Sequence, residues 1–148
     1  MNVNGKSYKD WTENDLRTLI NNEDFRECQF LDYKRTFEFL EAGNKSEKTK
    51  GKNEFRNDVC SFANADGGDL IFGVTEKNGV ASSIQPIAIE NIDRFELDLR
   101  NIMLSIQPSI PNVDFKFIAI KGTSEDSAPE YLVVVHIEKG IFKPYMTV

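Results

Sequence analysis

Hydrophobic and polar positions along this chain repeat with two different periods. At helical spacing, apolar residues recur over residues 12–20, 52–65 and 91–106. Thr12 and Asn91 are residue types that commonly cap helix N-termini, and each directly precedes one of these patterns. The spacing therefore predicts three helices.

The middle helix is defined by Phe55, Val59, Phe62 and Ala63, which fall on one stripe. The stripe stops at Asp66-Gly67-Gly68, where glycine can adopt the left-handed conformation that ends a helix. We expect Phe62 to cover a central strand of the sheet.

Runs of strand length lie between the helical segments. They are residues 29–37, 69–75, 80–84, 113–120 and 131–137. The run at 69–75 is mostly apolar, which indicates a central strand, and residues 76–79 provide a hairpin turn after it. Alternation over 113–120 indicates an edge strand that forms a long hairpin with 131–137.

The order of these elements predicts an α+β fold, with a mixed, mainly antiparallel sheet and two or three packed helices. A chain of 148 residues is long enough for one core, so we expect a single domain over residues 1–148. The chain ends on an extended apolar piece without a polar stop. This leaves open that it is the N-terminal part of a longer protein with further C-terminal domains.

Composition narrows the class of protein. The hydrophobic fraction is 40%, the charged fraction is 28%, and no apolar run approaches the roughly 20 residues of a membrane span. The first residues carry no apolar export signal, so we expect a cytoplasmic protein that does not contact membranes. The net charge of -6 excludes a surface that is basic all over, so any nucleic-acid site must be local.

One segment opposes the acidic balance. Residues 43–57 carry five basic side chains against Glu47 and Glu54, a net charge of +3, which leaves -9 on the rest of the chain. The basic residues are Lys45, Lys48, Lys50, Lys52 and Arg56. Two interpretations stay open for its first ten residues: a solvated loop, or a mobile basic flap over a phosphate backbone.

Carboxylates occur at the ends of two predicted strands. Glu27 and Asp32 lie near the start of the first strand, and Glu76 follows the central one. Three converging carboxylates would hold a hard divalent cation such as Mg²⁺ or Mn²⁺. Positions five apart on a continuous strand face opposite sides, so Glu27 joins Asp32 only if the chain bends between them. The alternative is a set of scattered surface carboxylates in an acidic protein.

Other signals for chemistry are weak. The glycine pair at 67–68 follows a helix instead of preceding one, and the spacing from Gly43 to Gly51-Lys52 does not match a phosphate-binding loop, so we find no nucleotide site. The single histidine, His136, lies in an apolar run and is interpreted as a strand residue. The aromatic side chains that could stack on bases are more typical of a core; they are Trp11, Tyr33, Phe37 and Phe39.

Two phrases of the sequence are familiar as a pair: ECQFLDYK at residues 27–34 and NDVCSFANADGGDLIFGV at 57–74, followed by Asn78-Gly79. Together they resemble the Schlafen AlbA-like domain of bacterial transcriptional regulators and related proteins. The resemblance covers about residues 23–148, and KPYMTV at 143–148 is similar to the stretch before the family's final strand.

The resemblance implies an α+β nucleic-acid-binding domain and, in the Schlafen branch, a metal-dependent endoribonuclease with three acidic residues. These would be Glu27, Asp32 and Glu76; Asp32 and Glu76 keep the family's charge but differ from its pattern by one methylene. Lys34 matches a family lysine suited to phosphate, and Arg35 follows it. The resemblance also implies that residues 43–52 are a variable insertion, and that Asn64 caps the turn that the paired glycines close.

Three functions from different classes follow. The leading one is binding of DNA or RNA, as part of a transcriptional regulator or defence protein, with contacts from Lys34, Arg35 and the basic segment. The second is metal-dependent RNA cleavage. The third is a protein-interaction module without nucleic-acid affinity. The choice between DNA and RNA, the target sequence and the formation of a homodimer stay open.

Overall fold

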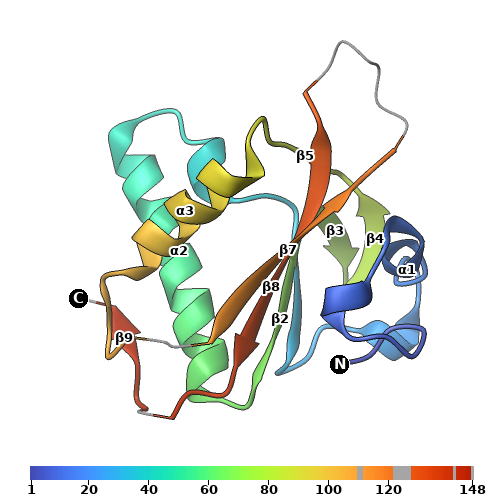
Figure 1. Ribbon diagram of the computed structural model, residues 1–148, viewed down its shortest axis with the longest axis horizontal. Helices are drawn as coiled ribbons and strands as arrows, with labels where there is room; N and C mark the ends of the chain where they lie inside the picture. The colour runs from blue at the N-terminus through green and yellow to red at the C-terminus, as the bar shows by residue number, and fades with distance from the viewer. Residues whose placement is uncertain (110–111, 122–127, 142, 148) are drawn as a thin grey trace.

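The computed structural model describes residues 1–109, 112–121, 128–141 and 143–147, and its architecture is α+β, as the sequence predicts (Figure 1). Its described α-helices are α1 (Glu13–Arg17), α2 (Lys45–Asn64) and α3 (Ile92–Met103). Short 3-10 helices are η1 (Tyr8–Asp10), η2 (Glu23–Phe25) and η3 (Glu38–Leu40). The strands are β1 (Leu31–Lys34), β2 (Gly67–Phe72), β3 (Val74–Lys77), β4 (Val80–Ile84), β5 (Ile87–Ala88), β6 (Ile106–Gln107), β7 (Val113–Ala119), β8 (Glu130–Glu138) and β9 (Met146–Thr147).

The main sheet has the order β1-β2-β8-β5, and β7 pairs with β8. Strands β1 and β2 are parallel, whereas the pairs that β8 makes with β2, β5 and β7 are antiparallel. The predicted hairpin of β7 and β8 and the central position of β2 are therefore confirmed. None of the described helices is long and apolar enough to cross a membrane.

Both faces of the sheet are covered, which explains the continuous apolar runs in its central strands. Leu70 and Phe72 of β2 pack with α2 and α3, and Ile71 between them packs on the opposite face. Figure 1 shows α2 and α3 on one side of the sheet, and α1 with the β3–β4 hairpin on the other. The alternation of side chains along β2 thus separates two hydrophobic clusters.

Helix α2 corrects the prediction of a loop at residues 43–52, because the helix begins at Lys45 instead of Lys52. The side chain of Asn44 accepts a hydrogen bond from the backbone N–H of Glu47 at 2.8 Å, which satisfies a donor of the first turn. Gly51 lies inside the helix because η3 packs against it: a Cβ there would lie 2.6 Å from the backbone N of Phe39. The basic segment is therefore helical.

The sequence predicts one strand over residues 69–75, but the structure has two, because Gly73 divides the run. Gly73 has a φ of +97°, a backbone conformation that glycine adopts more readily than residues with a side chain. Its carbonyl accepts a hydrogen bond from the N–H of Gln85 at 2.7 Å. Beyond it, β3 leaves the main sheet and pairs with β4 in a separate two-stranded sheet. The predicted hairpin turn at 76–79 is confirmed, but it belongs to this second sheet.

The N-terminal segment covers the second face. Thr12 caps α1, as predicted, and its N–H donates to the carboxylate of Asp15 at 2.9 Å. Trp11 is 2% exposed, and its indole N–H donates to the carbonyl of Lys6 at 2.9 Å. Trp11 is thus a core residue and not a base-stacking one.

Of the other aromatic residues considered for base stacking, Phe37 and Tyr33 also lie in the core. Phe37 is 1% exposed and stacks on Phe72 with ring centroids 3.8 Å apart. Tyr33 is buried, whereas Phe39 is only half-buried. His136 lies on β8, where its Nδ1 is 2.8 Å from the carboxylate of the buried Asp69. This histidine is a hydrogen-bonded strand residue, as the sequence indicates.

Asn64 acts differently from the capping role that the resemblance implies. Its side-chain amide donates to the carbonyl of Tyr145 at 3.0 Å and accepts from the N–H of Tyr145 at 2.7 Å. These two bonds hold the C-terminal segment, in which Tyr145 is buried and β9 pairs with β6. The end of α2 therefore anchors a chain segment 81 residues away in the sequence.

Candidate nucleic-acid interface

A tight turn brings Glu27 back toward β1. Cys28 and Leu31 exchange backbone hydrogen bonds of 3.0 and 3.3 Å, so the chain reverses between Glu27 and Asp32. Oε1 of Glu27 accepts the N–H of Tyr33 at 3.3 Å. This is the bend that strand alternation alone does not predict, and it places the Glu27 and Asp32 carboxylates in one environment.

The environment of the Glu27 carboxyl disfavours its charged form. Burial, the negative charge of Asp32 and the more distant charge of Glu76 raise the pKa of Glu27 to about 7, against the opposing N–H of Tyr33. Glu76 itself accepts the N–H of Gly79 at 2.8 Å and stays exposed on the hairpin. Both other predicted acids therefore act on Glu27, and Asp32 has the larger effect.

Lys34 joins this pair to helix α2. Its ammonium lies 3.3 Å from Asp32 and 3.6 Å from Asp58, and all three side chains are about one third exposed. Burial would lower the pKa of Lys34, but Asp58 and Asp32 together raise it. Lys34 is thus held between two carboxylates, and we name Glu27, Asp32, Lys34 and Asp58 the acidic cleft.

Asp58 was not identified from the sequence. It lies one position before Val59 at the margin of the apolar stripe of α2, on the side that faces β1. Burial raises the pKa of Asp58, and Lys34 opposes that shift. The sequence shows only an acidic residue next to a buried helix stripe. The contact with Lys34 in the folded structure is what identifies Asp58 as part of the site.

Small cavities open on both sides of Asp58. One of about 370 Å³ is lined by Glu27, Asp32, Asp58 and the end of α2. A second, of about 210 Å³, is lined by Lys34 and Asp58 together with η3. Arg35 borders the second cavity, but its guanidinium is bound by Glu41. The acidic cleft is therefore accessible, and both Lys34 and the neighbouring Arg35 are already paired with carboxylates.

A second surface lies on the N-terminal half of α2, where the basic residues are sorted by helical spacing. Lys45, Lys48, Lys52 and Arg56 follow one another at three- and four-residue steps and share one side of the helix. Lys50 lies two residues from both Lys48 and Lys52, on the opposite side. The helix thus concentrates four of the five predicted cations and excludes Lys50.

This side of α2 forms a groove of about 670 Å³ with α3 and η3. We name it the basic groove; its lining residues are Lys48, Lys52, Arg56, Phe39, Leu40, Phe95, Asp98, Asn101 and Ile102. In the described part of the chain, neither Lys48 nor Lys52 lies within ion-pair distance of a carboxylate, and Asp98 is bound to Arg94. Two free ammonium groups therefore lie beside an apolar wall.

Arg56 differs from the two lysines. Its Nη1 donates to the carbonyl of Ile102 at 3.0 Å, and its other terminal nitrogen binds the side chain of Asn53. Its Nε is buried without a partner among the described residues. Arg56 therefore connects α2 to the end of α3, and most of its hydrogen-bonding capacity is used within the protein.

Comparison with known proteins agrees with the two sequence phrases. A family model described as "Schlafen, AlbA_2" matches residues 27–148. The chain belongs to the Schlafen AlbA_2 family. Membership of this family suggests a nucleic-acid-related domain.

Other comparisons add less. No curated protein matches the chain. Among solved structures, it is similar to the DIP2311 protein from Corynebacterium diphtheriae, with a TM-score of 0.47 and 18% sequence identity. The match covers 89% of this chain but 22% of that one. The chain thus spans about a fifth of the length of that protein.

The Schlafen AlbA_2 match starts at Glu27, so the acidic cleft and the basic groove lie inside it, whereas α1 lies before it. Among the described residues, no group of three histidine, cysteine, aspartate or glutamate side chains is arranged to hold a metal ion. The Asp32 carboxylate is shared with Lys34, and that of Glu76 with its own turn.

Proposed function

We propose that this domain binds DNA or RNA through the basic groove. The observation that carries the proposal is the pair of unpaired ammonium groups, Lys48 and Lys52, in a concave surface of an acidic chain. A cation that already has a carboxylate partner gains little from a phosphate, because one ion pair replaces another. Free lysines instead release counterions from the nucleic acid when they bind.

The walls of the basic groove support contact with more than the phosphate backbone. Phe39 and Phe95 are half-buried, and Leu40 is 46% exposed, so apolar surface lies next to the lysines. Unstacked bases bind such surfaces, while phosphates bind the neighbouring cations. Lys45 extends the same basic side toward the start of α2, whereas Lys34 and Arg35 contribute less because both are paired with carboxylates.

The test compares two charge reversals on one helix. Fluorescence anisotropy would measure binding of labelled single-stranded DNA, duplex DNA and hairpin RNA to the parent chain, to the Lys48→Glu/Lys52→Glu variant and to Lys50→Glu as the control. We expect the double variant to weaken binding by about tenfold or more and the control to change it by less than about threefold. Equal losses in both variants, or no binding by the parent, would contradict the proposal.

A second candidate is phosphodiester cleavage at the acidic cleft. The observation that favours it is the position of Glu27 on an open cavity beside Asp32, with a pKa of about 7. A carboxyl group with that pKa accepts and releases a proton at neutral pH, which is the property that a general base or acid needs.

Cleavage is tested separately from binding. Labelled RNA would be incubated with the parent chain, with Glu27→Gln and with the Lys50→Glu control, each with and without Mg²⁺ or Mn²⁺. The candidate requires that the parent and the control cleave, and that Glu27→Gln binds RNA but loses cleavage. Binding without cleavage by all three proteins would leave nucleic-acid binding as the function.

A further inference from the structure

Strand β7 is an edge of the main sheet, and part of its outer edge is open. The hydrogen bonds of Ile120 N to Glu130 O and of Glu138 N to Asn112 O show that the even-numbered residues of this strand bond to β8. The N–H and C=O groups of the odd-numbered residues therefore point away from β8.

The structure already uses both ends of this edge. The carbonyl of Val113 accepts from Arg100 at 3.3 Å, and the N–H of Phe115 is bound to the Asp114 side chain at 3.0 Å. At the other end, the N–H of Lys121 donates to the carboxylate of Glu13 at 2.8 Å. Within the described residues, Phe117 and Ala119 are left with unpartnered N–H and C=O groups on the open side.

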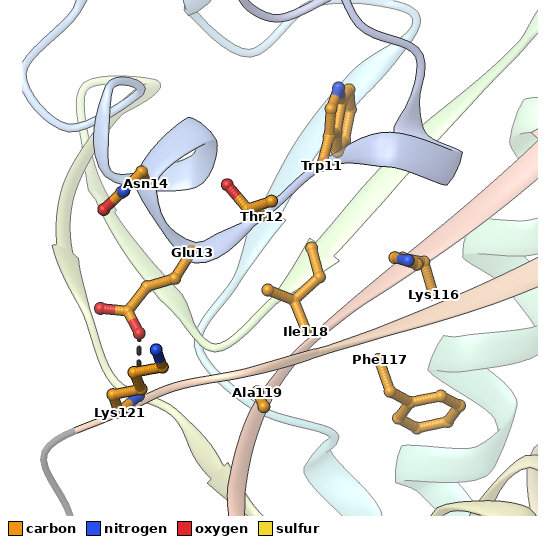
Figure 2. Close-up of a pocket in the computed structure, with 9 residues that line it drawn as sticks. All are labelled: Trp11, Thr12, Glu13, Asn14, Lys116, Phe117, Ile118, Ala119 and Lys121. Carbon is orange, nitrogen blue, oxygen red and sulfur yellow. Dashed lines mark hydrogen bonds between the residues drawn. The ribbon is translucent and has the colours of Figure 1, made fainter.

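A groove of about 430 Å³ lies along this open section, and we name it the edge groove. Figure 2 shows its two walls: the segment from Trp11 to Asn14, and β7 with Lys121 beyond it. The first wall precedes residue 27, where the Schlafen AlbA_2 match begins, whereas β7 lies inside the match. Trp11 and Ile118 of the edge groove belong to one hydrophobic cluster and Ile102 of the basic groove belongs to the other, so the two grooves lie on opposite faces of the sheet.

Two lysines and one glutamate line the edge groove. Lys116 and Lys121 stand toward its two ends, and neither ammonium is within ion-pair distance of a carboxylate in the described part of the chain. Glu13 is already bound by Arg17 and by the backbone of Lys121, both at 2.8 Å. An incoming segment therefore meets two cations and no free acid from the lining residues.

We propose that the edge groove binds an extended acidic peptide, which adds a strand to β7. The four open backbone groups of Phe117 and Ala119 provide the hydrogen bonds of strand addition. Lys116 lies within β7 and Lys121 lies two residues beyond its last residue, Ala119, so an extended segment of about six residues with a carboxylate at each end spans the distance between them.

A second copy of this chain fits the edge less well. Antiparallel self-pairing that joins Phe117 to Ala119 would place Lys116 opposite Ile120 of the partner copy, and Lys121 opposite Phe115. Both lysines would then lie at an interface without a carboxylate partner. Lysine on an edge strand is a common barrier to such self-association.

Binding is measured with the capped peptide Glu-Thr-Val-Thr-Val-Glu and with its Lys-Thr-Val-Thr-Val-Lys counterpart. Trp11 is the only tryptophan of the chain and lines the groove, so its fluorescence reports binding directly. The amide resonances of Phe117 and Ala119 report whether the peptide reaches the edge. We expect the acidic peptide to shift both signals and the basic peptide to shift neither.

Two variants separate backbone pairing from charge. Lys116→Glu/Lys121→Glu should weaken binding of the acidic peptide by about tenfold and should allow the basic peptide to bind. The matched reversal Lys50→Glu/Lys77→Glu should leave binding of both peptides unchanged. Ala119→Pro removes an N–H that β8 does not use, and should abolish binding of the acidic peptide. The thermal midpoint of each variant shows that it is folded.

Several results would overturn the proposal. Unchanged Trp11 emission and unchanged Phe117 and Ala119 resonances with the acidic peptide would exclude the site. Peptide binding equally reduced by both charge reversals would show a nonspecific electrostatic effect. A concentration-dependent dimer of the parent chain that Ala119→Pro abolishes would assign the edge to a second copy instead. Nucleic-acid binding is independent of all three outcomes.

Discussion

The acidic cleft and the basic groove both include residues of helix α2, but their lysines differ in whether they have a carboxylate partner. In the acidic cleft, Lys34 is partly buried and held between Asp32 and Asp58. In the basic groove, Lys48 and Lys52 have no carboxylate partner among the described residues. Paired and half-buried charges affect folding and pKa values, whereas free surface charges mainly affect association with an oppositely charged ligand.

The comparison predicts that the acidic cleft couples to stability and the basic groove couples to salt-dependent binding. Helix α2 is shared by both, because its C-terminal half supplies Asp58 and its N-terminal half supplies the lysines. Substitutions can therefore be chosen to affect both regions, only the acidic cleft, or only the basic groove.

The largest effect is expected from a core substitution that affects both regions. Phe55 is 4% exposed on α2 and packs near Phe37 and Phe72, with ring centroids 5.8 and 6.1 Å away. Phe55→Ala should lower the free energy of unfolding by about 3–5 kcal/mol, measured by urea denaturation. A loss below about 1 kcal/mol would show that α2 is not packed on the sheet as described.

A smaller effect is expected from breaking the ion pair of the acidic cleft. Lys34→Met leaves Asp58 half-buried without its cation and should cost about 1–3 kcal/mol at pH 8. Because the folded-state pKa of Asp58 is already raised and would rise further without Lys34, the loss should become smaller as the pH is lowered. A cost independent of pH would contradict the pairing, and Lys50→Met provides the exposed control.

The titration of Glu27 should change the free energy of unfolding by less than the loss of Lys34 does. Its folded pKa of about 7 exceeds the value of about 4.3 for an unfolded glutamate, so the folded state binds the proton more tightly. Its contribution to stability is complete below about pH 4 and is lost as pH rises to about 7, by roughly 1 kcal/mol after solvent screening.

Glu27→Gln removes this titrating group while it keeps the shape of the side chain. The variant should show a flatter dependence of unfolding free energy on pH between about 4 and 8. The same slope in parent and variant would mean that burial and the charges of Asp32 and Glu76 do not raise the pKa of Glu27.

The smallest stability effect is expected in the basic groove. Lys48→Ala/Lys52→Ala should change the unfolding free energy by less than about 0.5 kcal/mol, because neither lysine has a partner to lose. The same variant should reduce the salt slope of duplex binding by about 1.8, since each phosphate that a lysine neutralises contributes about 0.9 to that slope. A large stability change would show that these lysines are structural and would weaken the comparison.

Much of the fold was predictable from the chain alone, because hydrophobic periodicity depends on local geometry. The spacing of Leu99 and Ile102 with their neighbours predicted α3, and the apolar run over β8 predicted a buried strand. Local signals failed where tertiary contacts override them. Gly51 and a polar stretch indicate a loop, but packing of η3 on Gly51 and the Asn44 cap extend α2 to Lys45.

The candidate site depended on the tertiary structure to a greater extent. Sequence phrases and residue types identified Glu27, Asp32 and the basic segment, because these are properties of composition and order. The turn at Cys28–Leu31 that returns Glu27 to Asp32, and the approach of Asp58 to Lys34, are contacts between chain segments and leave no periodic trace. Helix formation separated Lys50 from Lys48 and Lys52, because side chains two positions apart point to different sides of a helix.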